Sequence, residues 1–224
     1  MKLLLAIADL KDIAPTLTHY GVVPNAGPVA YLSTAQILQH EVTLCETGVG
    51  VYQTAYKITK ALSQQKYHLA LKMSLGNAYK AEYPIGTALN IVNEKPGDYG
   101  MLIGNEWKDL YDLELIKREA EPHVRGGLVN LTNAYMNVFM PFKKAVGISV
   151  NNYADKEKVQ LRQEKYKADC ETGDGIGFTY PCLFEKQNFY HLCVVERKLL
   201  SGEESATAAR EKLNEVLIDL LSKI

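Results

Sequence analysis

The stretch from Ala168 to Cys182, ADCETGDGIGFTYPC, joins a polar segment to an apolar one and gathers acidic residues and glycines at the junction. Glu171 and Asp174 lie three residues apart, and the glycines around them allow the backbone to approach a bound molecule closely. Carboxylates in this arrangement can accept hydrogen bonds from the neighbouring hydroxyls of a sugar. A helix N-terminus would also favour acidic residues through its dipole, so this stretch alone leaves both interpretations open.

Apolar runs alternate with helical patterns on both sides of this stretch. We expect strands at 2–8, 41–46, 69–75, 87–93, 145–150 and 190–196, with weaker candidates at 29–32 and 37–39. The expected helices are 9–20, which contains Pro15, and 52–65, 156–167, 178–186 and 206–221. Strands separated by helices of this length predict a single α/β domain over residues 1–224 with a mostly parallel sheet.

Three glycine-bearing turns follow expected strands, at 48–50, 76–79 and 173–177. Ligands of parallel α/β sheets bind at the carboxyl ends of strands, so the three turns together predict a cleft. Residues 94–141 are rich in Pro, Gly, Asn and aromatics, and we expect them to form loops and short elements over this site. The chain has neither a dinucleotide fingerprint nor a P-loop, so a nucleotide-binding α/β protein of the Rossmann or P-loop type is the weakest of the functions considered.

The amino-acid composition limits the kinds of molecule that the chain is expected to bind. The 25 basic and 26 acidic residues give a net charge of -1, which predicts no nucleic-acid binding. No apolar run approaches the ~20 residues of a membrane span, and residues 1–8 are typical of a buried strand rather than a signal peptide. The four cysteines form no CxxC pair and the five histidines have no ligand spacing, so we expect buried thiols, a cytoplasmic location, and no metal or cofactor.

Motifs along nearly the whole chain resemble the nucleoside phosphorylase and nucleosidase superfamily, and most closely the futalosine hydrolases. The matching segments are ADLKDIAP at 8–15, ETGVG at 46–50 with QTAY at 53–56, SLGNAY at 74–79, PIGT at 84–87, DYG at 98–100, DLYDL at 109–113, GISVN at 147–151 and ADCETGDG at 168–175. The resemblance implies a nucleoside phosphorylase-like, three-layer sandwich with a mixed, mostly parallel central sheet flanked by helices. It also implies a homodimer or larger homo-oligomer and a connection with menaquinone biosynthesis.

The same resemblance implies hydrolysis of the N-glycosidic bond of a purine nucleoside, with release of the base. It assigns Asp12 to activation of water, Asp174 to the ribose hydroxyls and Ser201 to the edge of the base. The other implied substrate-binding positions are Gly48, Gly76, Tyr79, Glu171 and Gly173. Phosphorolysis is disfavoured because phosphorylase relatives carry an arginine where this chain has Ser74.

The departures from the family pattern fall at these same positions. Asp12 stands where the family has Glu, Gly173-Asp174 where it has Met-Glu, and Tyr79 where it has a glycine. Ser201 replaces an Asn or Asp, and a serine hydroxyl is too weak an acid to protonate a leaving base. The alternative is therefore a catalytically degenerate paralogue that binds a nucleoside or serves as an oligomeric partner. Asp12 could then be only a helix acid and Asp174 only a turn residue.

Overall fold

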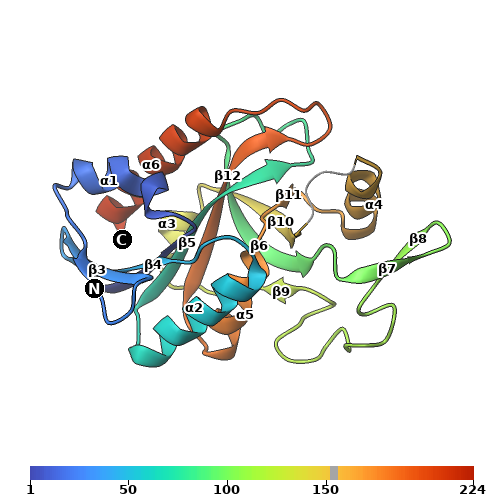
Figure 1. The fold of residues 1–224 in the computed structure, drawn as a ribbon, viewed down its shortest axis with the longest axis horizontal. Coiled ribbons are helices and arrows are strands. Elements are labelled where there is room, and N and C mark those ends of the chain that lie inside the picture. The colour runs from blue at the N-terminus through green and yellow to red at the C-terminus, as the bar shows by residue number, and fades with distance from the viewer. Residues whose placement is uncertain (152–155) are drawn as a thin grey trace.

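One large mixed sheet dominates the computed structural model, which describes residues 1–151 and 156–224 (Figure 1). Its strands and those of a separate hairpin are β1 (Lys2–Ile7), β2 (Asn25–Ala26), β3 (Leu32–Ile37), β4 (His40–Glu46), β5 (Leu69–Ala78), β6 (Ala88–Pro96), β7 (Gly100–Ile103), β8 (Glu106–Asp109), β9 (Leu128–Val129), β10 (Lys143–Ser149), β11 (Cys170–Glu171) and β12 (Phe189–Lys198). The helices are η1 (a 3₁₀ helix, Leu10–Ile13), α1 (Ala14–His19), α2 (Val51–Gln64), α3 (Met136–Phe139), α4 (Lys156–Tyr166), α5 (Gly175–Phe184) and α6 (Ala206–Lys223).

Half of the sheet forms the predicted sandwich. The strands β4, β1, β5 and β12 run parallel to one another, and their near-continuous apolar sequences are buried on both faces. Helices α1 and α6 cover one face, and α2 and α5 cover the other (Figure 1). The apolar stripe predicted for the C-terminal helix is confirmed, since all of its members are buried against the sheet: Leu213, Val216, Leu217, Leu220 and Leu221.

The other half of the sheet closes into a barrel, which corrects the prediction of a simple sandwich. Strands β11, β10, β6, β12 and β5 form a ring, because β11 pairs with β10 on one side and with the end of β5 on the other. Two of the ring's pairings, β6 with β12 and β5 with β11, are antiparallel. The expected strand at 69–75 therefore continues to Ala78, since its last residues complete the ring and leave no open edge.

The structure changes the predicted bounds of two helices, the first helix of the chain and α5. The expected helix 9–20 is divided into η1, capped by the Asp9 side chain, and α1, in whose first turn Pro15 lies. Proline is favoured there because it has no N–H to leave unpaired, so it begins α1 and does not kink a longer helix. Helix α5 begins at Gly175, three residues earlier than expected, and contains Pro181.

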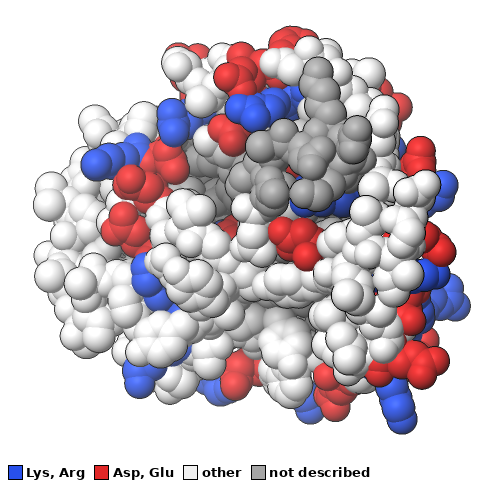
Figure 2. All heavy atoms as spheres, turned by 45° about the vertical axis from the view of Figure 1, so that its right-hand side comes forward, with Lys and Arg blue, Asp and Glu red and all other residues white. Residues whose placement is uncertain are grey.

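The segment 94–141 contains the end of β6, the β7–β8 hairpin, β9 and α3. The hairpin extends from the barrel end of the molecule beside α4 (Figure 1). On the face in Figure 2, acidic and basic side chains are interspersed among uncharged ones. In the described residues, no helix combines the length and the apolar character that a membrane crossing requires. The four cysteines are buried and free, as predicted.

Candidate active site

A pocket of about 180 Å³ lies where the ends of several strands meet. Its wall includes the end of β1 at Ile7, the turn 48–50 after β4, and Glu196 near the end of β12. The segment Thr172–Asp174, between β11 and α5, forms another part of the wall, and Lys72–Leu75 of β5 forms the floor. A pocket at the carboxyl ends of parallel strands is where α/β sheets place their ligands.

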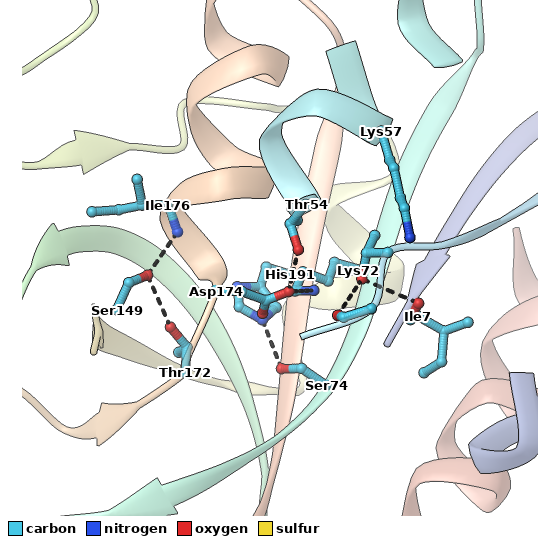
Figure 3. A network of polar contacts seen from close by, with 12 residues as sticks. Ile7, Thr54, Lys57, Lys72, Ser74, Ser149, Thr172, Asp174, Ile176 and His191 are labelled. Atoms are coloured by element: carbon cyan, nitrogen blue, oxygen red, sulfur yellow. Dashed lines mark hydrogen bonds and ion pairs between the residues drawn. The ribbon is translucent and has the colours of Figure 1, made fainter. Parts of the chain in front are cut away.

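Asp174 is held at the pocket by two buried partners from different elements. Its Oδ2 lies 2.9 Å from Lys72 Nζ on β5 and accepts a 2.6 Å hydrogen bond from Thr54 Oγ1 on α2. Figure 3 shows the Thr54 and Lys72 side chains on either side of the Asp174 carboxylate that both contact. The Lys72 side chain is 1% exposed and that of Asp174 is 10% exposed. The ion pair therefore fixes the carboxylate and directs Lys72 away from solvent.

Two further carboxyl groups belong to the pocket wall. Asp12, in η1, accepts a 2.7 Å hydrogen bond at Oδ1 from Arg210 Nε of α6. Glu196 lies at a β-bulge of β12 and is half-buried. Burial raises the pKa of Glu196 above its ordinary value, and Arg210 and Arg197 partly offset that rise. Asp12, whose carboxylate is held by an arginine, is suited to accept a proton. Glu196, which keeps its proton to higher pH, is suited to donate one.

Four of the eight predicted site residues line this pocket, namely Asp12, Gly48, Gly173 and Asp174. Gly173 has a φ of +71°, a left-handed conformation that a methionine at this position would adopt only with strain. The backbone turn at Gly173 thus accounts for one departure from the family pattern. None of the pocket's described lining residues comes from 94–141, so the covering role of that segment stays a prediction.

Three of the predicted residues lie in the protein interior, outside the pocket wall. Tyr79 is 1% exposed and donates a 2.6 Å hydrogen bond to Glu171 Oε1. Arg162 of α4 lies 3.2 Å from the same oxygen, so Glu171 joins α4 to the barrel. Gly76 brings β5 close to Glu171, whose carbonyl oxygen would lie 2.6 Å from an added Cβ. These residues contribute to barrel closure, and their expected contacts with substrate stay predictions that this pocket does not support.

Ser201 lies in the exposed turn between β12 and α6, where its Oγ accepts a 3.4 Å hydrogen bond from the Glu203 backbone. It is not part of the pocket wall. The displacement has a local cause, because the bulge at Glu196 shifts the register of β12 and the strand continues to Lys198. The carboxyl group that β12 brings to the pocket is Glu196, five positions before Ser201.

Sequence reasoning missed Glu196 and Lys72 as pocket residues, although each left a signal. Lys72 interrupts the apolar strand sequence LALKMSL, and a lysine is almost never fully buried unless it is paired. Glu196 directly follows the buried run LCVV, at the end of a strand where ligands bind. Among the described residues, no group of three or more His, Cys, Asp or Glu side chains is placed to hold a metal ion.

Solved structures with the same fold cover the whole chain. A futalosine hydrolase mutant from Helicobacter pylori strain 26695 has a TM-score of 0.81 at 13% identity, with both chains covered completely. A 5'-methylthioadenosine/S-adenosylhomocysteine nucleosidase from S. pneumoniae, in complex with a transition-state inhibitor, has a TM-score of 0.80 at 11% identity, covering 100% of this chain and 99% of the other. The corresponding nucleosidase from Campylobacter jejuni has a TM-score of 0.77 at 15% identity, covering 100% and 98%.

No protein-family model matches the sequence, and no curated protein gives a significant match. The structural similarity shows that the chain has the nucleoside phosphorylase-like α/β fold, of which futalosine hydrolase and the methylthioadenosine nucleosidases are examples. The expected resemblance to that superfamily is thereby confirmed at the level of the fold. Because the sequence identities are so low, an activity has to be argued from the residues of the pocket and not from the shared fold.

Proposed function

We propose that this chain is a nucleosidase that hydrolyses the N-glycosidic bond of a purine nucleoside and releases the base. The observation that carries the proposal is the convergence of Asp12, Asp174 and Glu196 on one pocket. The structures of the same fold include a futalosine hydrolase and methylthioadenosine nucleosidases, which supports this reaction class.

The proposed reaction needs three groups, and each has a candidate. Glu196, whose burial favours the protonated form, donates a proton to the base nitrogen as the C1′–N bond breaks and its electrons pass to the base. A water molecule forms the new C1′–O bond, and Asp12 takes the water's proton. Asp174 accepts hydrogen bonds from the ribose hydroxyls through Oδ1, since Oδ2 is engaged by Thr54 and Lys72. In this scheme Glu196 supplies the acid that Ser201 cannot.

Hydrolysis fits the pocket better than phosphorolysis. Among the described lining residues, Lys72 is the one basic side chain, and its charge is already paired with Asp174. Ser74 stands where phosphorylase relatives carry an arginine, and a serine provides no forked cation for a phosphate dianion. We therefore propose water as the acceptor of the sugar.

The alternative, a paralogue that binds a nucleoside without turnover, also has an observation in its favour. The Lys72 contact occupies one oxygen of the carboxylate assigned to ribose, and Arg210 occupies the carboxylate assigned to water. A protein of this kind would be stabilised by its ligand and would leave it intact. A ligand at 100 times its Kd should add about 2.7 kcal/mol to the free energy of unfolding.

We extend the proposal to a homodimer or larger homo-oligomer. Large apolar side chains of α2 and the turn before it are exposed beside the pocket, including Val49 (76%) and Tyr52 (77%). Tyr56 and Tyr180 form, with Phe184, an apolar groove between α2 and α5. Exposed apolar surface of this kind is typical of protein contacts. A cytoplasmic location and a role in menaquinone biosynthesis rest on the family resemblance alone.

The test is base release from purine nucleosides by the wild-type chain and by D12N and E196Q. We expect each substitution to lower turnover by 10²–10⁴-fold, the usual contribution of a positioned acid or base. E203Q is the matched control, because Glu203 follows the same strand but pairs with Lys198 and is exposed. Equal turnover in E196Q and E203Q would remove Glu196 from the mechanism. Ligand stabilisation without base release from the wild type would favour the binding paralogue.

A further inference from the structure

A buried polar chain begins at the pocket floor and enters the barrel. Ser74, which belongs to the pocket wall, has its Oγ 2.8 Å from His191 Nε2. His191 comes from β12 and is fully buried. Figure 3 shows Ser74 and His191 facing each other beside the Lys72–Asp174 pair. None of these contacts has a part in the proton transfers proposed above for Asp12 and Glu196.

The chain continues to a buried carboxyl group. Glu94 of β6 is 1% exposed, and its Oε2 lies 3.9 Å from His191 Nδ1. Neither of these two atoms has a hydrogen-bond partner among the described residues, whereas Glu94 Oε1 accepts from Ser149 Oγ at 2.9 Å and Thr172 Oγ1 at 2.5 Å. Unpaired buried polar atoms are costly, and here two of them face each other. At 3.9 Å the two atoms are too far apart for a hydrogen bond, and a proton carried by either one would join them once the side chains approach by roughly 1 Å.

The space for this carboxyl group is provided by two glycines. A Cβ added to Gly147 would lie 2.6 Å from Glu94 Oε2, and one added to Gly175 would lie 2.5 Å from Glu94 Cδ. Any side chain at these positions would displace Glu94 from His191. The arrangement thus depends on glycines in β10 and at the start of α5.

We propose that Glu94, His191 and Ser74 form a proton relay whose outer end, the Ser74 hydroxyl, is a further catalytic group that contacts the ligand. This inference rests on the proposed nucleosidase function for the identity of the ligand. The position of one buried proton determines whether the Ser74 hydroxyl donates or accepts a hydrogen bond in the pocket.

Two protonation states of the relay give Ser74 opposite roles. When Glu94 holds the proton, its O–H donates to His191 Nδ1, the Nε2–H donates to Ser74 Oγ, and the serine hydroxyl donates its hydrogen to the ligand. When that proton has left, His191 carries its hydrogen on Nδ1 and donates it to the Glu94 carboxylate. The His191 Nε2 then accepts from the serine hydroxyl, and Ser74 Oγ accepts from the ligand. The states differ by one proton.

The charges around the relay place its titration near neutrality. Burial raises the pKa of Glu94 to about 7, although the hydrogen bonds from Thr172 and Ser149 oppose the rise. Of the charged groups that face it, Asp174 also raises this pKa and Lys72 lowers it. Burial, together with Lys72, lowers the pKa of His191 well below its ordinary range, so the imidazole is neutral in both states. The exchangeable proton therefore belongs to Glu94.

The relay can be tested without any substrate by ¹⁵N NMR of the histidine side chains. We expect the His191 signal, assigned by its absence in H191Q, to change from the Nε2–H tautomer at pH 5.5 to the Nδ1–H tautomer at pH 8.5. E94Q should abolish the change, because its amide does not titrate. S74A should keep it, since Ser74 lies at the outer end. One tautomer at every pH in the wild type, or an unaltered change in E94Q, would overturn the relay.

The role of Ser74 toward the ligand is tested by the pH profile of kcat. S74A should lower kcat by about 10²-fold and remove the inflection near neutrality, whereas S74T should retain both because it keeps the hydroxyl. If Ser74 only packs against His191, S74A would change stability and leave the pH profile of kcat as in the wild type. A tautomer change in a protein without turnover would refute the nucleosidase function and leave the relay intact. Turnover without the tautomer change would refute the relay alone.

Discussion

The ion pair between Lys72 and Asp174 makes a strong prediction about stability. D174A removes the partner of an ammonium group whose side chain is 1% exposed, and at 2.9 Å Asp174 Oδ2 is its one carboxylate contact among the described residues. K72M removes the partner of a carboxylate that keeps its hydrogen bond from Thr54 and remains 10% exposed at the pocket. The two single substitutions should therefore differ in cost, although they break the same contact.

The magnitudes follow from burial. An uncompensated buried charge costs about 3–5 kcal/mol, so D174A should lower the free energy of unfolding by about 4 kcal/mol. K72M should cost about 2 kcal/mol, because Asp174 retains a hydrogen bond to its charged form. The double variant leaves neither charge behind and should be within about 2 kcal/mol of the wild type. Independent effects would instead add to about 6 kcal/mol.

The assay is urea unfolding of the four proteins, followed by circular dichroism, with melting temperatures as a second measure. For a chain of this size, 4 kcal/mol corresponds to a fall of about 8–16 °C in Tm. Additive costs, or a D174A protein as stable as K72M, would refute the account of a buried, mutually dependent pair. The stability of D174A also determines how a loss of its activity is interpreted. An unfolded D174A protein would be inactive even if Asp174 made no contact with ribose.

Three further predictions concern single groups. E196Q should remove the fall in kcat/KM on the alkaline side that deprotonation of Glu196 produces, and a pH profile identical to the wild type would exclude Glu196 as the acid. Y79F should lower the free energy of unfolding by about 1–3 kcal/mol, because the Tyr79 hydroxyl donates a hydrogen bond to the buried carboxylate of Glu171. Ligand affinity, measured by calorimetry, should stay unchanged, and weaker binding would indicate that Tyr79 contacts the ligand. Glu94 has a folded pKa raised from 4.5 to about 7, so its contribution to stability is fully present below pH 4.5 and is lost as the pH rises through about 7. Urea unfolding at pH 5 and pH 8 should show the wild type losing about 2.5 kcal/mol more than E94Q, and equal losses would contradict the buried titration.

The parallel half of the fold could be predicted because its sequence pattern is local. Buried strands such as 69–75 are continuous apolar runs, and the C-terminal helix has an apolar stripe at helical spacing. Barrel closure could not be predicted in this way, because β11 has two residues and its pairing with Asn77 and Ala78 joins segments far apart in the chain. The same closure buries Tyr79 and Glu171, which the motif pattern had assigned to substrate.

The site was predictable where a motif stays in register with its strand. Gly173 and Asp174 belong to a glycine-bearing turn that stands out in the sequence, and both line the pocket. Ser201 lies outside this pocket wall, and a one-residue bulge at Glu196 changes which side chains of β12 face the pocket. No local sequence pattern predicts a bulge, so the position of Glu196 in the pocket wall is seen only in the three-dimensional pairing of β12 with β5.

The central claim, that this pocket cleaves an N-glycosidic bond with water, is tested most directly by base release in H₂¹⁸O. The panel comprises futalosine, methylthioadenosine, adenosylhomocysteine, adenosine and inosine, each with and without phosphate, with the base followed by chromatography and the sugar by mass spectrometry. The account predicts release of hypoxanthine or adenine from at least one of these, at the same rate with and without phosphate, and one ¹⁸O atom in the sugar product. No base release at high protein concentration, or release only with phosphate and formation of a sugar 1-phosphate, would contradict it.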